Sequence, residues 1–533
     1  MAQAAIFGIN SNLDTGGIID NLIALQRAPV RLVEAKRTIE EAKLLSFRDL
    51  KNRLQNFKSV VTTLNTDARF LSTQGSFSNN NSIDNNSVVS LSTSSLATSG
   101  TFSLTVNNLA RETKLISDGF AAPDTTISEG TFKIVDGSSS ATITLDDSNN
   151  TVDGLRLAIN NSGLNLRASF INDGSDTNPV RLAVSGTKSG LDNAISVSFT
   201  GTDAPTFSET QSAENSNFVL DGVAVTKSGN VVSDVIDGTI LTLESAGSGT
   251  VTLSADTDAI KGKIQAYVDG FNEIVAYLNA ELALNSSTGE TGVLFANFTV
   301  QNLQQTLRES ISKQIVGITG DFNYLSQIGI RTASDGTVTI DDGELTDALA
   351  SNIANISQLF SSSSSTTSSA VTFIGFTSDT QPGGYNIRVT DGVPQLAASG
   401  STTFVDAVGN GNFFAGAEGT DAEGLNFRIA SLIDGDYGNI SLSIGVAEIT
   451  NRVLANLTDA SLEGPLEAEI DTAVETIEDF DDTLLQLEGR IILFEENIRE
   501  RFTNLEVVLG RLNSQKAAFE SSIAGIQALF SGK

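Results

Sequence analysis

Residues 477–526 read IEDFDDTLLQLEGRIILFEENIRERFTNLEVVLGRLNSQKAAFESSIAGI, and this segment sets the architecture of the chain. Every seventh residue in it is apolar: Ile477, Leu484, Ile491, Ile498, Leu505, Leu512, Phe519 and Ile526. A second position of the repeat is mixed: Val474, Asp481, Glu488, Phe502, Leu509, Lys516 and Ile523. The repeat predicts a helix from about residue 467 to 530, roughly 90 Å long at about 1.5 Å per residue. Because such a helix has one apolar stripe, it needs a partner helix to cover that stripe.

The partner is predicted near the amino end, where a helical pattern runs from about residue 15 to 71. Its apolar residues are spaced alternately three and four apart: Phe47, Leu50, Leu54, Phe57, Val61, Leu64, Ala68 and Leu71. This is the spacing of a coiled-coil seam. Upstream, Leu25, Leu32 and Ile39 repeat every seven residues in a shifted register. We expect a stutter near residues 42–46 to join the two registers.

Charge supports this pairing of the two ends. Residues 20–69 hold ten Lys or Arg and six Asp or Glu, a net charge of +4. Residues 467–511 hold four Arg and thirteen Asp or Glu, a net charge of −9. Complementary charge selects partner and register even where single exposed ion pairs contribute little. We therefore expect the two ends to fold back and pair, either within one chain or between subunits.

Between the ends, the apolar pattern changes to the period of two that is typical of strands. Residues 101–106 alternate, and residues 132–134 and 143–145 flank the turn Asp136–Gly137, which predicts a hairpin. Residues 152–160 have a short helical pattern, and further strands are predicted up to residue 253. Helices return at residues 258–284, 298–316 and 344–360. Residues 361–369 are all Ser or Thr, and this composition predicts a flexible linker.

Composition excludes several classes of function. The 533 residues carry a formal charge of −32, which disfavours a nucleic-acid-binding protein because such a protein needs a basic face. The chain has no His and no Cys, so the usual proton shuttle, zinc ligands and thiol nucleophile are absent. No apolar run is long enough to span a membrane, and the first twelve residues lack the pattern of a cleavable signal peptide. We therefore expect no enzyme activity and no cofactor. We also expect no metal site, because the acidic turns do not match calcium-loop spacing.

The sequence therefore predicts an α+β multidomain protein, with long terminal coiled-coil helices as a stalk and inserted antiparallel β-rich head domains. The predicted boundaries are an amino-terminal segment, 1–19, and an amino-terminal helix of the leg, 20–71. A first β-rich head domain covers 72–117 plus 216–257, and a second covers 118–215. A helical leg domain (258–360), the linker (361–369) and an extra β-rich insertion (370–447) follow. The carboxyl-terminal helix of the leg is 451–511, and a terminal helix is 512–533.

Several motifs, in order, carry a resemblance to a known family. Residues 9–14, with Leu13 and Asp14, and then Ile18 to Leu25 and Ala28-Pro29, resemble the amino motif of the flagellar filament cap family, hook-associated protein 2 of the FliD type. Asn12 stands where that family usually has Gly. Residues 130–197, with Asn160 near the centre, are similar to the flagellin hook IN motif. The carboxyl part matches more specifically, at residues 218–222, 229–230, 234–243, 256–264, 268–275, 328–330, Asp335-Gly336-Thr337, 348–349 and 501–515.

This resemblance implies a ring at the growing tip of the flagellar filament, which lets exported flagellin fold and insert beneath it. The implied partners are further copies of the chain (four to six in a ring), flagellin, the hook–filament junction protein, and the flagellar type III export apparatus with its chaperone. It implies an extracellular location at the distal tip. Residues 1–19 would then be an export or filament-contact segment, and residues 512–533 a filament-contact helix. The apolar seam residues would be the oligomer or filament interface, and the family motif positions would be Leu13, Asp14, Pro29, Asn160, Asp335 and Gly336.

Three other functions remain open from the residues. A surface adhesin would use the β insertion and the middle domain to bind host or environmental ligands. A hydrolase of surface polymers would use acidic pairs such as Asp146–Asp147. Another flagellar axial protein, such as a junction protein or a flagellin, would share the terminal heptads, although the carboxyl motifs favour the cap.

Overall fold

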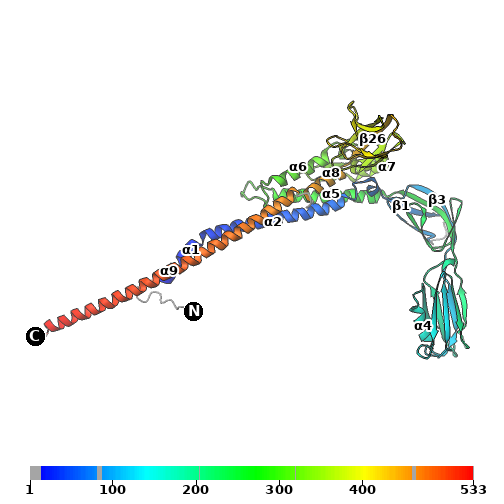
Figure 1. Cartoon of the computed structure of the whole chain (residues 1–533), viewed down its shortest axis with the longest axis horizontal. Coiled ribbons are helices and arrows are strands. Elements are labelled where there is room, and N and C mark those ends of the chain that lie inside the picture. The colour runs from blue at the N-terminus through cyan, green and yellow to red at the C-terminus, as the bar shows by residue number, and fades with distance from the viewer. Residues whose placement is uncertain (1–13, 81–86, 203–204, 319, 459–463, 532–533) are drawn as a thin grey trace. The chain divides into compact units, whose positions relative to one another are not determined.

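The computed structural model describes residues 14–80, 87–202, 205–318, 320–458 and 464–531, and side chains as far as residue 527. The chain forms two compact units, one from residues up to 65 and from 264 onward, the other from residues 66–263. Long helices dominate the first unit and antiparallel sheets the second, so the protein is an α+β multidomain chain, as predicted (Figure 1). Among the described helices, none combines the length and apolar character that crossing a membrane requires.

The second unit begins with the short helix α3 (Asp67–Phe70) and a first β region. Its strands form a sheet in the order β1-β15-β3-β11-β12 and a smaller sheet in the order β13-β14-β2. Alternate residues of these strands, such as Leu104, Val251 and Leu241, are fully buried in one core, as a period of two requires. The strand bounds are β1 Thr73–Asn79, β2 Val89–Thr93, β3 Gly100–Asn108, β11 Ser216–Leu220, β12 Val223–Lys227, β13 Val231–Ile236, β14 Thr239–Leu243 and β15 Gly247–Ala255.

The second β region packs helix α4 with two sheets, in the orders β10-β4-β8-β7 and β6-β5-β9. The predicted hairpin is present: β5 pairs with β6, and Gly137 at the turn has a φ of +55°, which suits glycine. The expected boundary at residue 118 is wrong by four residues, because β4 begins at Lys114 and pairs with β8 and β10. The bounds are β4 Lys114–Phe120, β5 Gly130–Asp136, β6 Ser139–Leu145, α4 Val152–Asn160, β7 Leu166–Asn172, β8 Val180–Gly186, η1 Leu191–Asn193, β9 Ile195–Thr200 and β10 Phe207–Gln211.

Helices of the first unit depart from the prediction at both ends. The amino helix ends at Gln26 and restarts at Ala28, because Pro29 has no N–H to continue the hydrogen bonding. The expected helix 451–511 is two helices, since α8 ends at Thr458 and α9 begins at Pro465 and continues unbroken past residue 511. The bounds are α1 Thr15–Gln26, α2 Ala28–Val61, α5 Thr257–Glu281, α6 Phe298–Ser312, η2 Leu325–Ile328, β16 Ile330–Thr332, β17 Val338–Ile340, α7 Asp342–Phe360, α8 Val446–Thr458 and α9 Pro465–Ser531.

The predicted insertion is a β-sandwich of two sheets, in the orders β18-β26-β20-β21-β22 and β19-β25-β24-β23, around one core. The prediction of a flexible linker at 361–369 is wrong. Residues 362–366 form β18, because the long strand β26 offers a complete ladder and the small hydroxyl side chains fit beside it, with Ser363 Oγ 2.9 Å from Ser443 Oγ. The bounds are β18 Ser362–Thr366, β19 Val371–Gly375, β20 Gly383–Thr390, β21 Val393–Ala398, β22 Val405–Asp406, β23 Val408–Asn410, β24 Phe413–Ala415, β25 Asn426–Ile429 and β26 Gly435–Ile444.

Arg452 on α8 fixes the insertion to the helices. Its guanidinium donates to the carbonyl oxygens of Thr377, Ser378 and Thr380 at 3.2, 2.8 and 3.2 Å and lies over the ring of Phe376, 5.2 Å from the centroid. The insertion also enters and leaves through neighbouring residues, because the Gly445 N–H donates to the Ser361 carbonyl at 3.0 Å. Sequence reasoning missed this attachment, because the acceptors are backbone carbonyl groups that no sequence pattern marks.

Candidate functional site: the paired terminal helices

The predicted seam of α2 is the best-packed part of the helical unit. Phe47, Leu50, Leu54, Phe57, Val61 and Leu64 are each at most 2 % exposed. From Leu54 onward these residues lie past the end of α9, because Lys51 pairs with Glu467 near the start of that helix, and they face α5 and α8 instead. The Phe57 ring lies 5.4 Å from that of Tyr267 and 6.4 Å from that of Phe271. Gly270 makes this approach possible, since a Cβ there would lie 2.7 Å from the Phe57 ring. Helix α2 ends at Val61, so Leu64 lies just past its end but is still buried, whereas the last two predicted positions, Ala68 and Leu71, are exposed.

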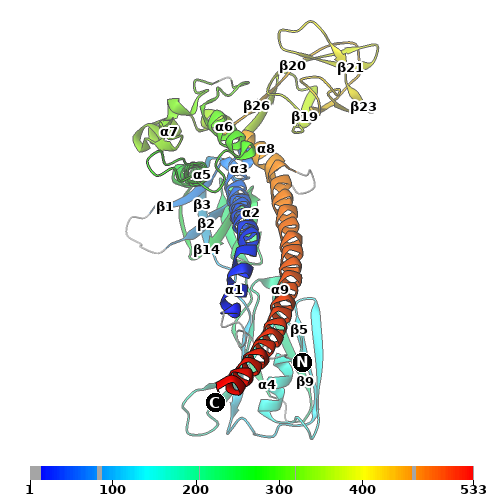
Figure 2. The ribbon, with the colours of Figure 1, turned by 90° about the vertical axis from the view of Figure 1, so that its left-hand side faces the viewer.

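Helix α9 lies along α2 and α1, in both views of the chain (Figures 1 and 2). Among its predicted seam residues, Ile491 is buried, and Ile477, Leu484 and Ile498 are half-buried. The second, mixed position lies partly in the seam, because Val474, Asp481, Phe502 and Leu509 are half-buried and Glu488 is exposed. The structure also half-buries residues three places after the seam residues, Phe480, Leu487 and Phe494, which are all apolar.

Opposite charges meet across this pair, within one chain. Arg37 Nε lies 2.6 Å from Asp481 Oδ1, and Lys51 Nζ lies 2.5 Å from Glu467 Oε2. The hydrogen bond to Asp481 raises the pKa of Arg37 above its ordinary value. Lys51 lies fourteen residues after Arg37 on α2, whereas its partner Glu467 lies fourteen residues before Asp481 on α9. The two helices are therefore antiparallel. The prediction that the ends pair through complementary charge is confirmed.

The stutter expected near residues 42–46 is wrong. Helix α2 continues without a break, and its inner face uses Val30, Val33, Arg37, Glu40 and Leu44, which keep the three-and-four spacing up to Phe47. Two of these positions are charged, and for that reason the apolar pattern hid them. Leu25, Leu32 and Ile39 lie on the outer face instead and are 71, 60 and 58 % exposed.

The outer third of α9 carries the remaining predicted seam residues, and the described part of α1 does not cover them. Leu505, Leu512, Phe519 and Ile526 are 43, 52, 68 and 54 % exposed. An exposed apolar stripe of this length is unusual on a soluble protein and marks a surface that another protein segment contacts.

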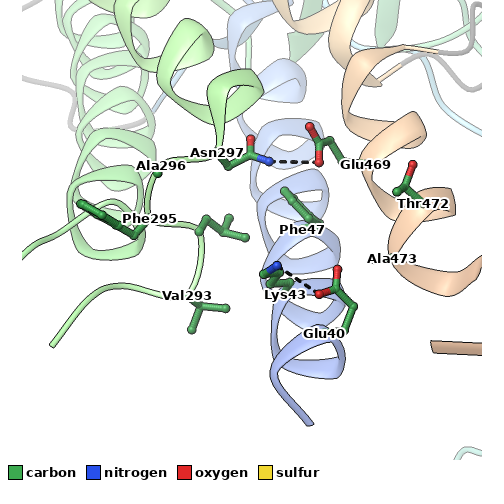
Figure 3. A pocket seen from close by; sticks show the side chains of 11 residues that line it. Glu40, Lys43, Phe47, Val293, Phe295, Ala296, Asn297, Glu469, Thr472 and Ala473 are labelled. Carbon is green, nitrogen blue, oxygen red and sulfur yellow. Dashed lines mark hydrogen bonds and ion pairs between the residues drawn. The ribbon is translucent and has the colours of Figure 1, made fainter. Parts of the chain in front are cut away.

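A small pocket of about 230 Å³ lies where the loop 293–297 meets the helical pair (Figure 3). Phe47 and Ala473 line it together with Glu40 and Glu469. Both carboxylates have partners: Lys43 Nζ lies 3.0 Å from Glu40, and Asn297 Nδ2 donates to Glu469 at 3.0 Å (Figure 3). The Thr299 hydroxyl donates to Glu469 as well, at 2.7 Å. These contacts tie the loop to α9, and they give the pocket a structural role.

The family motif residues that the structure describes hold the backbone in place. Asp14 caps α1 by accepting from the Gly17 N–H at 2.9 Å, and Pro29 occupies the first turn of α2. Asn160 joins α4 to β7 by binding both the N–H and the carbonyl of Ala168, at 2.8 and 2.9 Å. Leu13 lies outside the described residues.

Asp335 and Gly336 form the turn before β17. The Thr337 hydroxyl, 2.6 Å away, lowers the pKa of Asp335, and Gly336 has a φ of +87°. Among the described residues, no three acidic side chains gather where they could hold a metal ion.

Comparison with known proteins defines the class to which this fold belongs. The family profile described as "Flagellar hook-associated protein 2 C-terminus" (FliD_C) matches residues 213–514, and "Flagellar hook-associated protein 2 N-terminus" (FliD_N) matches residues 11–113. These matches span well over half of the chain, so it belongs to the FliD family of hook-associated protein 2. It is a flagellar filament capping protein.

Individual relatives agree with this assignment. The chain is 28 % identical over 388 residues to flagellar hook-associated protein 2 of Escherichia coli K12, covering 67 % of this chain and 80 % of that one. It is 28 % identical over 353 residues to the B-type protein of Pseudomonas aeruginosa, covering 60 % and 72 %. The crystal structure of the D1-D2-D3 domains of the flagellar cap protein FliD from Escherichia coli matches with a TM-score of 0.53 and 22 % identity, over 80 % of this chain and 99 % of that one. It shows a shared fold.

Replacing Leu54 by Ala tests the seam. Leu54 is fully buried, so L54A is expected to lower the free energy of unfolding by about 2–5 kcal/mol. Leu45 lies on the same helix and is 67 % exposed, so L45A is expected to change it by less than about 0.5 kcal/mol. Urea denaturation followed by circular dichroism measures both. Equal losses for the two variants would contradict the assigned packing.

Reversing the charges of Arg37 and Asp481 tests the pairing. R37E and D481R should each weaken the helical pair, and the double variant should recover part of the loss. The expected coupling is about 0.2–1 kcal/mol, because both side chains are partly exposed. A double-mutant cycle on thermal unfolding measures this coupling. A coupling of zero would show that the ion pair does not stabilise the pairing of α2 with α9.

Alkaline titration tests the packing of α5 on α2. Burial, with the nearby Glu281, raises the pKa of Tyr277 to about 12, and its hydroxyl donates to the Ser46 carbonyl at 2.8 Å. In the unfolded chain tyrosine ionises near pH ~10, so its contribution to stability is complete below that pH and is lost as the pH rises toward 12. Y277F should flatten this part of the stability profile. An unchanged profile would place Tyr277 in solvent.

Proposed function

We propose that this capping protein forms a ring of four to six copies at the distal tip of the flagellar filament, outside the cell. There it retains exported flagellin and promotes its folding and polymerisation. The observation that carries the proposal is the outer third of α9, whose four large apolar residues are exposed at seven-residue intervals. In an extracellular assembly protein, such a stripe is a binding surface for other helices.

The mechanism that we infer is mechanical. Neighbouring legs separate at one position of the ring, an emerging flagellin folds in the gap, and its insertion moves the cap by one step. Such stepping requires contacts between subunits that are strong as a set but weak individually. Each contact must therefore be small and have a polar rim.

The wider set of partners follows from the same role. We infer contacts with flagellin and with the hook–filament junction protein, and passage through the flagellar type III export apparatus with its chaperone. Nucleic acid is not among the partners we propose, because a chain with a charge of −32 repels phosphate. We propose neither membrane insertion, nor a cofactor, nor catalysis.

Genetic deletion tests this function. Cells that lack the gene should build hooks but no filaments and release flagellin into the medium. The full chain should restore filaments, whereas a chain that ends at Gly510 should not, because it lacks most of the exposed stripe. Electron microscopy and immunoblotting of the medium measure both. Normal filaments in the deletion strain, or full rescue by the shortened chain, would contradict the proposal.

Removal of the insertion is the matched control, and it separates capping from adhesion. Ser361 and Gly445 are hydrogen-bonded neighbours, so residues 362–444 can be replaced by a short glycine linker. This variant should still retain flagellin. If it also loses attachment to surfaces, the insertion has an adhesive role beside capping.

A further inference from the structure

The outer face of α2 carries a second coiled-coil seam. Leu25, at the end of α1, and then Ala28, Leu32, Ala35 and Ile39 follow one another at intervals of three and four residues. All five are exposed, on roughly the opposite side of the helix from the face that meets α9. Large and small side chains alternate, and the described part of the chain provides no helix to cover them. A seam with this spacing is complete only when another helix packs on it.

Helix α9 has a matching surface on its own outer face. Leu485 and Ile492 are 70 and 58 % exposed, and the exposed Gly489 lies between them. Leu484 and Ile491, next to them in sequence, face inward, so these three residues point away from α2. The paired helices therefore form a ribbon with an apolar strip along each of its two outer edges.

The two strips lie at the same height along the ribbon. The Arg37–Asp481 ion pair fixes the level, and the helices are antiparallel. Leu32 lies five residues before Arg37, and Leu485 four residues after Asp481, so both lie in the same direction from the ion pair. Ala28 lies nine residues before Arg37, and Gly489 lies eight residues after Asp481. Leu25 and Ile492 lie twelve and eleven residues from the same ion pair. Each pair therefore agrees within one residue, about 1.5 Å.

Charge distinguishes the two edges. Arg31 and Lys36 flank the α2 strip, whereas Asp482 and Glu488 flank the α9 strip, and all four side chains are exposed. None of the four belongs to an ion pair within the described residues. At equal height, Lys36 is level with Asp482 and Arg31 is level with Glu488. One edge is basic and apolar, and the other is acidic and apolar.

We propose that the α2 edge of one copy docks on the α9 edge of a second copy, with the stalks side by side at equal height. Leu32 then meets Leu485, Leu25 meets Ile492, and Ala28 meets Gly489, where the absence of bulk lets the helices approach closely. The two partners present different surfaces, so the contact is of the head-to-tail kind that closes into a ring when the rotation fits.

This inference rests on the proposed ring and adds a contact between its legs. Three apolar layers and two exposed charge pairs make a small contact, which a folding flagellin can open at one position while the others hold. The gap in which flagellin folds would then form where one of these contacts between neighbouring legs opens.

Cross-linking tests the contact, because the chain has no cysteine of its own. Cells that lack the gene would produce the L32C and L485C chains together, and their filaments would be treated with a short bismaleimide. We expect a covalent dimer of the two variants and none from either variant alone, since the contact is head-to-tail. The matched control is L45C with L485C, because Leu45 is equally exposed on α2 but lies off the strip.

Charge reversal gives an independent measurement. R31E should reduce the dimer obtained from L32C and L485C, and E488R on the other chain should restore it. If filaments still retain flagellin but show no dimer above the Leu45 control, the leg contact is wrong and the capping function stands. Cross-links to flagellin only, or from a single variant alone, would also overturn the contact. Loss of flagellin from cells with the unaltered chain would instead contradict the proposed function itself.

Discussion

The antiparallel register of α2 and α9 is the constraint on which the helical unit depends. It brings residues more than four hundred positions apart in the sequence to one level, as Arg37 and Asp481 show. Ion pairs of this exposure contribute little to stability one by one, and burial of apolar side chains such as Phe47 and Ile491 contributes more. The charges act differently, because they favour the observed register. A shift by one heptad would separate Lys51 from Glu467 and expose part of the seam.

Much of this arrangement could be predicted from the sequence. Strict heptads and opposite net charges identified the two helices and their pairing, because both signals are local and periodic. The strands of the β regions followed from alternation, and the hairpin at Asp136–Gly137 from turn chemistry. These features depend on residue type at fixed intervals, and nothing distant in the chain is needed to read them.

The errors arose where distant contacts decided the structure. Ser362–Thr366 has the composition of a linker, but β26, more than seventy residues later, provides a ladder that makes it a strand. Arg37 and Glu40 occupy inner positions of α2 that an apolar pattern cannot reveal, so Leu25, Leu32 and Ile39 were mistaken for the seam. The role of Arg452, which holds three carbonyl groups of the insertion, depends on backbone geometry that no motif records. In the described site, the sequence located the helices and the buried face from Phe47 onward correctly, and it misplaced only the inner face before Phe47.

The insertion leaves the helical unit at Ser361 and returns at Gly445, and these two residues are hydrogen-bonded to each other. A segment with such closely spaced ends is an exchangeable cassette. The insertion can be lengthened, replaced or lost without altering the spacing of any seam residue, because its two ends are adjacent and a short loop can join them. The surface of the insertion can therefore change while α2, α8 and α9 keep their packing.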